Sequence, residues 1–327
     1  MTEIPRVLSF GRWWPDDDLE REIVTAAGFQ FISGPAGVAR PAAELEEAVR
    51  EHRPSAILSC AAPVTRTVIE SCAELRVIAE SSVGVDNIDV DAATERAVQV
   101  TNVPDYCIPE VSDHAVALVL ALTRGIVSAD RAVHAGRWDS EVPGLRRLGS
   151  LTCGVVGYGR IGQETARKLG AFGCRVLATD PQPITPAEGV QMVDLDTLLT
   201  ESDVVVLHVP LTPQTRGLIR ARQLATMRPG SLLVNAGRGG VVDTAAVTAA
   251  LAQGQLAGAG LDVLDTEPEV PTDLLAQDGA VVTPHIGYSS DAALLELRQT
   301  AVQEIVRVLR GESPRHPCNT PAVEVIA

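Results

Sequence analysis

The stretch Leu151–Gly162, LTCGVVGYGRIG, constrains this chain more than any other part of it. An apolar run ends in the spacing Gly157-x-Gly159-x-x-Gly162, and a helical pattern follows at once. The first glycine permits a tight turn, the second lets the backbone approach a pyrophosphate, and the third lets a helix pack closely on a strand. Because a helix N-terminus offers free N–H groups, the stretch predicts a strand that leads into a phosphate-binding helix.

The residues that follow supply the context that a lone glycine pattern lacks. Residues 163–172 are typical of a helix, and residues 174–180, CRVLATD, are typical of an apolar strand that ends in a carboxylate. Asp180 lies 18 residues after Gly162, where the acid that bonds an adenosine ribose belongs. The plain alternative is an Asp that only begins a turn before Pro181. No Arg follows closely, which favours NAD over NADP.

Length and composition exclude several classes of protein. A chain of 327 residues exceeds one ordinary core and predicts two domains. The net charge of −15 disfavours a nucleic-acid partner, since such binding depends on Lys and Arg. No apolar run approaches the ~20 residues that span a bilayer, and no secretion signal is evident, so we expect a cytoplasmic chain. The cysteines show no C-x-x-C pair and no clustering with His, so neither a disulfide framework nor a metal site is expected.

Short apolar strands alternate with helical patterns on both sides of the glycine spacing, which predicts parallel sheets. Leu294–Arg310 is amphipathic and ends at Gly311. Because a sheet is already complete before this helix, we expect it to return to the first domain. The chain then divides into a first domain of residues 1–101 plus 291–327 and an inserted domain of residues 102–290. The expected strands are 6–10, 29–32, 55–59, 76–79, 98–103, 174–180, 204–209, 232–235, 258–262 and 280–283.

A long helix is expected from Ile108 to Arg124, and it is apolar on nearly every side. Such a helix requires burial. We expect it either between the domains or against another subunit, and a homodimer through residues 102–150 is the resulting hypothesis. Residues 125–149 lack clear periodicity and are expected to form an arm on that interface.

Three polar signals follow strands of the inserted domain, where ligands of open α/β sheets bind. Arg238 offers a planar fork that suits a carboxylate. His285 can exchange a proton near neutral pH, and a carboxylate such as Glu267 would orient its ring. Each has a plainer reading: a surface Arg between glycines, a Glu-Pro turn, or a His at a strand end. Together, behind a dinucleotide unit, they indicate hydride transfer at a 2-keto acid.

With these residues in place, the chain resembles the D-isomer-specific 2-hydroxyacid dehydrogenase family. That family includes phosphoglycerate dehydrogenases, glyoxylate and hydroxypyruvate reductases, and the C-terminal-binding-protein corepressors. The matching motifs run in family order from about residue 75 to 300, and they are VGVDNID, GYGRIG, LHVPLTPQTRGLI, LLVNAGRGGVVD, GAGLDV with a following EP, and TPHIGYSS.

The resemblance implies an α/β fold of two domains, with a doubly wound Rossmann cofactor domain inserted into a flavodoxin-like substrate domain. It implies that Arg238 binds the substrate carboxylate and keto oxygen, that His285 is the general acid or base, and that Glu267 holds His285. The backbone of Val83 and Gly84 would bind the substrate carboxylate, and the two domains would close over substrate and NAD. The residues implied on the cofactor side are Gly157, Gly159, Arg160, Ile161, Gly162, Asp180, His208, Pro210, Thr215 and Asp262.

Departures from the family pattern bear on the substrate. Glu80 stands where phosphoglycerate dehydrogenases place an Arg for the substrate phosphate, and its charge is expected to disfavour phosphoglycerate. Tyr288 stands where the corepressors have a Trp, while the segment around Tyr106 and Cys107 looks closest to that corepressor-like subgroup. Tyr106 and Tyr288 are therefore expected to shape the substrate pocket.

Two alternatives to a 2-keto-acid reductase stay open. One is a corepressor-like protein that senses NAD(H) and acts through binding partners with little turnover. The other is a dehydrogenase of an unusual metabolite such as a phosphonate intermediate.

Overall fold

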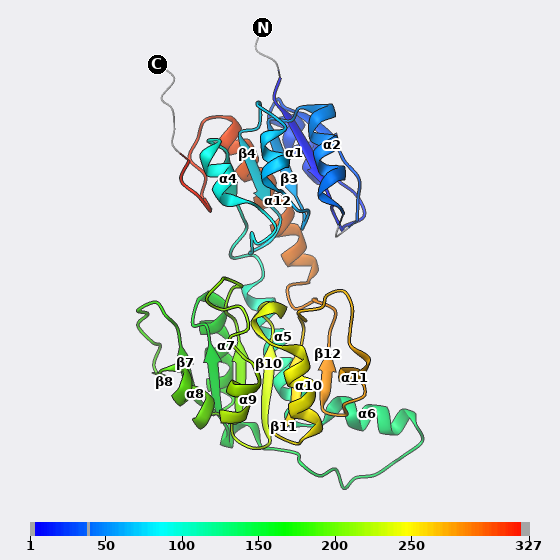
Figure 1. Ribbon diagram of the computed structural model, residues 1–327, viewed down its shortest axis with the longest axis vertical. Coiled ribbons are helices and arrows are strands. Elements are labelled where there is room, and N and C mark those ends of the chain that lie inside the picture. Colours follow the sequence, from blue (N-terminus) through cyan, green and yellow to red (C-terminus); the bar gives the residue numbers. More distant parts are fainter. Residues whose placement is uncertain (1–3, 38–39, 322–327) are drawn as a thin grey trace. The chain divides into compact units, whose positions relative to one another are not determined.

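The computed structural model describes residues 4–37 and 40–321 and divides the chain into two compact units (Figure 1). Unit 1 comprises Met1–Tyr106 and Ser290–Ala327, and unit 2 comprises Cys107–Ser289. The outermost residues of the first domain expected from the sequence, 1–3 and 322–327, lie outside the described residues.

The structural boundary lies a few residues beyond the expected one at 101/102. Asn102 and Val103 bond back into unit 1, and this explains the difference. The Asn102 side-chain amide donates to the Val83 carbonyl at 2.5 Å, and the Val103 N–H donates to the Ser82 carbonyl at 3.0 Å. The division of labour between a substrate-binding and a cofactor-binding domain stays a proposal at this point.

Unit 1 contains a parallel sheet with the strand order β2-β1-β3-β4-β5 in the described part of the chain. This is the flavodoxin-like order. The inner strands β3 and β4 are buried along their whole length, because helices cover both faces of the sheet. The strands are β1 (Arg6–Phe10), β2 (Gln30–Ser33), β3 (Ala56–Ser59), β4 (Val77–Glu80) and β5 (Gln99–Thr101).

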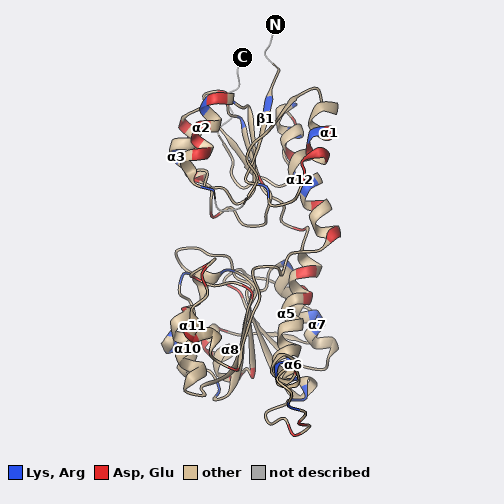
Figure 2. Cartoon of the chain, turned by 90° about the vertical axis from the view of Figure 1, so that its right-hand side faces the viewer, with Lys and Arg blue, Asp and Glu red and all other residues tan. Residues whose placement is uncertain are grey.

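The helices of unit 1 come from both ends of the chain. Helices α1 and α12 lie on one face of the sheet, and α2 and α3 lie on the other (Figure 2). The returning C-terminal helix expected from the sequence is confirmed as α12. The helices are α1 (Asp18–Ala26), α2 (Ala42–His52), α3 (Arg66–Glu70), α4 (Val90–Glu95) and α12 (Asp291–Leu309).

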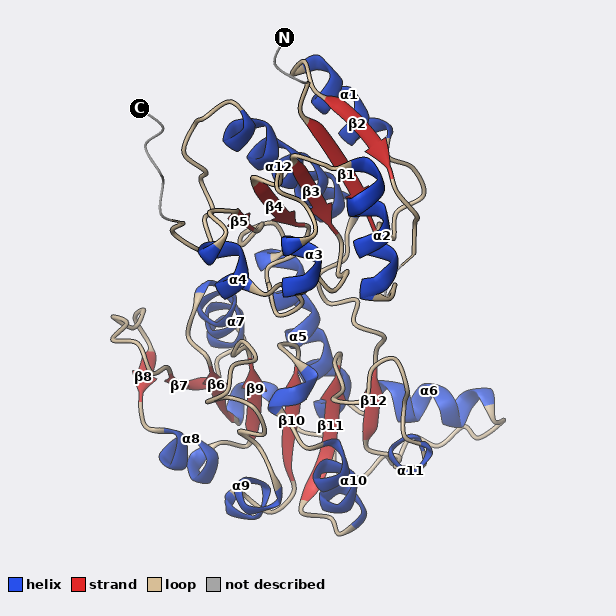
Figure 3. Ribbon diagram, turned by 45° about the horizontal axis from the view of Figure 1, so that its top comes forward, coloured by secondary structure: helices blue, strands red, loops and turns tan. Residues whose placement is uncertain are grey.

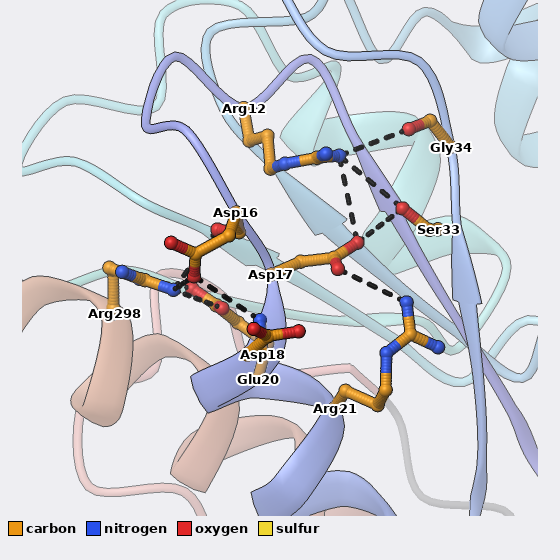
Figure 4. Close-up of polar contacts among 9 residues, drawn as sticks. All are labelled: Arg12, Asp16, Asp17, Asp18, Glu20, Arg21, Ser33, Gly34 and Arg298. Carbon is orange, nitrogen blue, oxygen red and sulfur yellow. Dashed lines mark hydrogen bonds and ion pairs between the residues drawn. The ribbon is translucent and has the colours of Figure 1, made fainter.

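A buried ion pair joins α12 to α1 (Figure 4). The Arg298 guanidinium donates to both oxygens of Glu20, at 2.7 and 2.8 Å, and Glu20 is fully buried. The same guanidinium carbon lies 5.5 Å from the centroid of the Trp14 ring. The pair is bidentate and shielded from water, so it ties the two ends of the chain together far more firmly than a surface pair would.

We predict that Arg298→Met lowers the free energy of unfolding of unit 1 by about 3–5 kcal/mol, because it leaves the Glu20 carboxylate buried without a partner. Urea denaturation followed by circular dichroism measures this. The double variant Arg298→Met/Glu20→Leu removes the stranded charge and is expected to recover most of the loss. A single variant within about 1 kcal/mol of the parent would contradict this account.

Unit 2 contains a second parallel sheet, with the order β12-β11-β10-β9-β6-β7-β8 over the described residues (Figure 3). The chain starts at β6, winds outward to β8, then returns to β9 and winds the other way, which is the doubly wound arrangement. The predicted fold class is confirmed. The strands are β6 (Thr152–Val156), β7 (Arg175–Thr179), β8 (Val190–Met192), β9 (Val204–Leu207), β10 (Ser231–Asn235), β11 (Leu256–Leu261) and β12 (Ala280–Val282).

The apolar helix expected from Ile108 to Arg124 is α5 (Ile108–Thr123), and its burial has a different origin from the one expected. It packs against α7 and against β10 and β11 of its own unit. Its own unit covers the buried residues of this helix, and a further contact with another domain or subunit stays a prediction. The other helices of unit 2 are α6 (Ile126–His134), α7 (Arg160–Ala171), α8 (Leu195–Glu201), α9 (Ala221–Thr226), α10 (Thr244–Ala252) and α11 (Thr272–Leu275).

Helix α6 lies in the region without clear sequence periodicity, and none of its residues is buried. No helix in residues 4–37 or 40–321 is both long and apolar enough to cross a membrane.

Candidate active site

The glycine spacing forms the turn between β6 and α7. Gly157 has φ +89°, a conformation that L side chains rarely adopt. A Cβ on Gly162 would lie 2.0 Å from the Gly157 carbonyl oxygen, so only glycine lets the helix start this close to the strand. Gly159 is different: it is exposed, it caps α7 without a side-chain hydrogen bond, and a Cβ there would meet nothing within 4 Å. The open side of this turn fits a pyrophosphate at the helix N-terminus.

Asp180 follows β7 and contacts this turn directly. Its carboxylate accepts from the Tyr158 N–H at 2.8 Å and from the Gln182 N–H at 2.9 Å, with one bond to each oxygen. A carboxylate oxygen can accept more than one bond, so lone pairs are left for ribose hydroxyls. Asp180 therefore also fastens the glycine turn, a role that the sequence reasoning missed.

The residues after β9 lie against the same turn. A Cβ on Gly157 would come within 2.9 Å of the His208 carbonyl carbon. The His208 Nε2 and the Thr165 hydroxyl on α7 are 2.9 Å apart, and burial lowers the pKa of His208 to about 4, so its ring is neutral. Thr215 donates to the Pro210 carbonyl at 2.6 Å and closes the following loop.

The loop after β10 carries Arg238. Buried Asn235 holds the loop through two bonds: its amide donates to the Arg238 carbonyl at 3.0 Å and accepts from the Gly237 N–H at 3.1 Å. A Cβ on Gly239 would lie 1.8 Å from the Leu264 carbonyl oxygen, so this loop is pressed against the loop after β11. The half-buried Arg238 is thereby placed on a rigid turn.

The structure brings Glu267 and His285 together. The His285 Nδ1 and a Glu267 oxygen are 2.9 Å apart, and the other Glu267 oxygen accepts from the Leu264 N–H at 2.7 Å. Burial alone raises the pKa of Glu267, but the bonds from His285 and Leu264 outweigh it and lower that pKa. Glu267 is thus an ionised acceptor for Nδ1–H, and Nε2 is the ring nitrogen left for a substrate.

His285 sits in a turn that few side chains adopt, with φ +55°. Buried Asp262 holds this turn in place. The Asp262 carbonyl accepts from the His285 N–H at 2.8 Å, and its carboxylate accepts from the N–H groups of Ile286 and Gly287 at 2.9 and 2.8 Å. The role at the nicotinamide that the resemblance implies for Asp262 stays a prediction.

His114 and Thr283 complete this network, and the sequence reasoning missed both. Thr283 donates to Asp262 at 2.7 Å, while the His114 Nε2 on α5 lies 2.9 Å from the Thr283 hydroxyl and 3.3 Å from the Asp262 carboxylate. Burial acts to raise the pKa of Asp262, but the bonds from His114, Thr283 and the backbone lower it to about 2. His114 follows the polar residues Glu110, Ser112 and Asp113 in α5, so the sequence does not single it out.

Tyr288 lies beside the catalytic candidate, with its ring 6.1 Å from that of His285, edge to face. Burial, followed by the charge of Asp262, raises the pKa of Tyr288. Tyr106 is buried in unit 1, whereas Tyr288 belongs to unit 2. Their predicted roles in a substrate pocket stay predictions.

Val83 and Gly84 belong to the loop after β4 in unit 1. Among the described residues, no hydrogen-bond acceptor faces the N–H of either one. Glu80, just before them, is not placed as expected, because it is 1 % exposed and both of its oxygens accept bonds from unit 1. It does not present its charge to a ligand, so Glu80 does not disfavour a phosphorylated substrate.

Comparison with known proteins places this geometry in a family. Residues 116–287 match the NAD binding domain of the D-isomer specific 2-hydroxyacid dehydrogenases. The chain belongs to that family. The NAD binding domain and the fit of the glycine turn and Asp180 agree on NAD as the cofactor.

Individual relatives cover most of this chain. A D-3-phosphoglycerate dehydrogenase of Archaeoglobus fulgidus is 41% identical over 80% of this chain and 50% of its own length. A glyoxylate reductase of Thermococcus litoralis is 38% identical over 78% of this chain and 80% of its own length. The crystal structure of D-lactate dehydrogenase from Aquifex aeolicus, complexed with NAD and lactic acid, is 29% identical with a TM-score of 0.80, covering 94% of this chain and 96% of that one. The chain spans about half the length of the phosphoglycerate dehydrogenases that it matches.

Two glycine variants test the cofactor site. We predict that Gly159→Ala leaves the free energy of unfolding within ~0.5 kcal/mol of the parent, because its methyl group enters open space. The same methyl group occupies the space at the helix start that we assign to the pyrophosphate, so NADH binding is expected to weaken on the order of tenfold. Gly162→Ala is expected to cost about 1–3 kcal/mol of stability without any ligand, since its methyl group meets backbone. Fluorescence titration with NADH and urea denaturation measure the two effects. Equal NADH affinity of parent and Gly159→Ala would refute the assignment.

Proposed function

We propose that this protein is an NAD-dependent oxidoreductase that interconverts a 2-keto acid and a D-2-hydroxy acid and works mainly as a reductase. The observation that carries the proposal is the Glu267–His285 pair, with 2.9 Å between the carboxylate oxygen and Nδ1, on the loops that follow β11 and β12. The dinucleotide turn follows β6 of the same sheet. The carboxyl ends of parallel strands share one edge, so the proton-transfer pair and the cofactor turn lie at the same edge.

The proposed chemistry assigns one task to each side chain. NADH, when bound, supplies the hydride that reduces the keto carbon, and NAD accepts it in the reverse direction. His285 Nε2 gives its proton to the keto oxygen in reduction and takes it back in oxidation. Ionised Glu267 holds the ring and stabilises the imidazolium. Arg238 binds the substrate carboxylate and polarises the keto oxygen, with a fork geometry that a carboxylate matches.

The substrate class follows from the donors offered to it. Two open N–H groups, of Val83 and Gly84, suit a carboxylate, and we assign them to the carboxyl group of the 2-keto acid. The names of the relatives support short 2-keto acids, since they include a glyoxylate reductase and a hydroxypyruvate reductase. These names also support turnover over a corepressor-like role limited to binding.

A steady-state assay tests the proposal. NADH oxidation is followed at 340 nm against glyoxylate, hydroxypyruvate, pyruvate, phenylpyruvate and 3-phosphohydroxypyruvate. We expect saturable turnover with at least one of them. If the protein binds NADH but turns over none, the enzyme reading is wrong.

Site variants test the roles. His285→Ala is expected to lower kcat by about 100-fold or more while leaving NADH affinity nearly unchanged, because only proton transfer is lost. Arg238→Ala is expected to raise KM and lower kcat together, because it removes binding and polarisation. Arg222→Ala, at an exposed position of α9, is the matched control and keeps parental kinetics. Near-parental rates in both site variants would overturn the assignment.

We further propose that the protein is a homodimer in the cytoplasm and that residues 126–145 form the interface. This arm exposes large apolar side chains that a monomer would leave in water: Ile126 is 55% exposed, Val133 48% and Trp138 89%. All six cysteines are free thiols, which is usual in a reducing compartment.

Sedimentation velocity tests the dimer. The parent is expected to sediment at twice the mass of the 34.5 kDa chain. Val133→Asp places a charge in the proposed interface and is expected to yield monomer. The control Phe172→Asp alters a similarly exposed side chain outside the arm and stays dimeric. A monomeric parent would contradict the proposal.

A further inference from the structure

A buried carboxyl group joins two loops at the carboxyl edge of the sheet in unit 1. Glu80, the last residue of β4, accepts from the Ala61 N–H in the loop after β3 at 2.9 Å. Its other oxygen accepts from the Asn87 side-chain amide at 3.0 Å, and that amide also donates to the Ala62 carbonyl at 2.8 Å. Ala61 has φ +57°, so the first loop is held in a conformation that a non-glycine residue rarely adopts.

The segment between Glu80 and Asn87 is the loop that carries Val83 and Gly84. Its carbonyls are already engaged: the Ser82 hydroxyl donates to the Gly84 carbonyl at 2.5 Å, and Asn102 donates to the Val83 carbonyl at 2.5 Å. The loop is thus pinned at its start, its middle and its end. The N–H groups of Val83 and Gly84 are among the donors of this loop that find no acceptor in the described residues.

We propose that Glu80 is a positioning residue that holds the 82–87 loop in the geometry in which its N–H groups bind the substrate carboxylate. The proposal rests on the function proposed above and deepens it. Glu80 does not touch the substrate. It acts through Asn87 and the loop, so its loss changes substrate affinity and leaves cofactor affinity alone.

The ionised state of this carboxyl group matters, because both of its oxygens face N–H donors. An ionised carboxylate is purely an acceptor, whereas a protonated acid carries a donor of its own. Burial raises the pKa of Glu80 to about 7 against the opposing hydrogen bonds, so the group changes charge near neutral pH. The nearby titratable groups are the thiols of Cys60, after β3, and Cys318, and burial followed by the charge of Glu80 raises the pKa of both.

Glu80→Gln tests this idea, since it keeps the shape of the side chain but turns a donor toward a donor. Asp203 in unit 2 provides a matched control, because its carboxylate accepts from the Thr152 N–H at 2.8 Å and from Arg228 at 2.9 Å and has no bond to unit 1 among the described residues. Three quantities are measured for the parent, Glu80→Gln and Asp203→Asn: KM and kcat with the best 2-keto acid, the dissociation constant of NADH, and that of oxamate with NADH bound. Oxamate is a non-reacting analogue of a 2-keto acid.

We expect Glu80→Gln to raise KM and the oxamate dissociation constant about tenfold at pH 8, with kcat and NADH affinity within twofold of the parent. At pH 5.5 the side chain at position 80 is neutral in both proteins, so the difference in oxamate affinity is expected to shrink to about twofold. Asp203→Asn is expected to match the parent in every constant.

A second variant, Asn87→Ala, removes the side-chain amide that donates to Glu80 and is expected to weaken oxamate binding similarly. It tests the proposal if Glu80→Gln fails to fold. Parental oxamate affinity in a folded variant, equal losses in Asp203→Asn, or no oxamate binding by the parent would each overturn the inference. If oxamate binds and both Glu80→Gln and Asn87→Ala weaken its binding while no keto acid is turned over, the inference stands and the proposed function fails.

Discussion

The candidate site depends on one buried carboxylate. The Asp262 carboxylate accepts bonds from Thr283, before His285, and from Ile286 and Gly287, after it, and so keeps His285 at a positive φ. The hydrogen bonds that lower its pKa to about 2 also keep it charged across the physiological range. A charge buried in this way is stable only when it is fully bonded. The position of the Glu267–His285 pair therefore depends on the packing of β11, β12 and α5.

The same physical rule organises both units. In each parallel sheet the strands end at a common edge, and the loops at that edge carry the polar residues. In unit 2 these loops hold the glycine turn, Arg238 and the Glu267–His285 pair. In unit 1 they hold Glu80 with its partners Ala61 and Asn87, and the N–H groups of Val83 and Gly84. In each unit, buried side chains that hydrogen-bond to these loops fix the shape of the loops.

Much of this arrangement was predictable from the sequence, and the failures have physical causes. The strand Arg6–Phe10 was predicted to the residue, because Pro5 and Gly11 bound a short run that is mostly apolar. The short strand β8 and helix α8 were missed, since neither offers enough residues to show a period. The packing of α5 on its own unit was not foreseen, because an apolar pattern indicates that a surface is covered without indicating which element covers it. Glu80 was misread for a related reason: a charged residue at a strand end has two directions to face, and only the fold selects one.

The ion pair between Arg298 and Glu20 has a consequence for how the chain acquires its structure. Helix α12 covers one face of the sheet in unit 1, and its residues follow all of unit 2 in the chain. During synthesis, Glu20 emerges long before its partner, so one face of the N-terminal sheet is covered by α1 alone while the continuous unit 2 is made. Exposed sheet faces of this kind favour aggregation. Slow synthesis or loss of α12 therefore leaves unit 1 as the half of the protein that depends on chaperones.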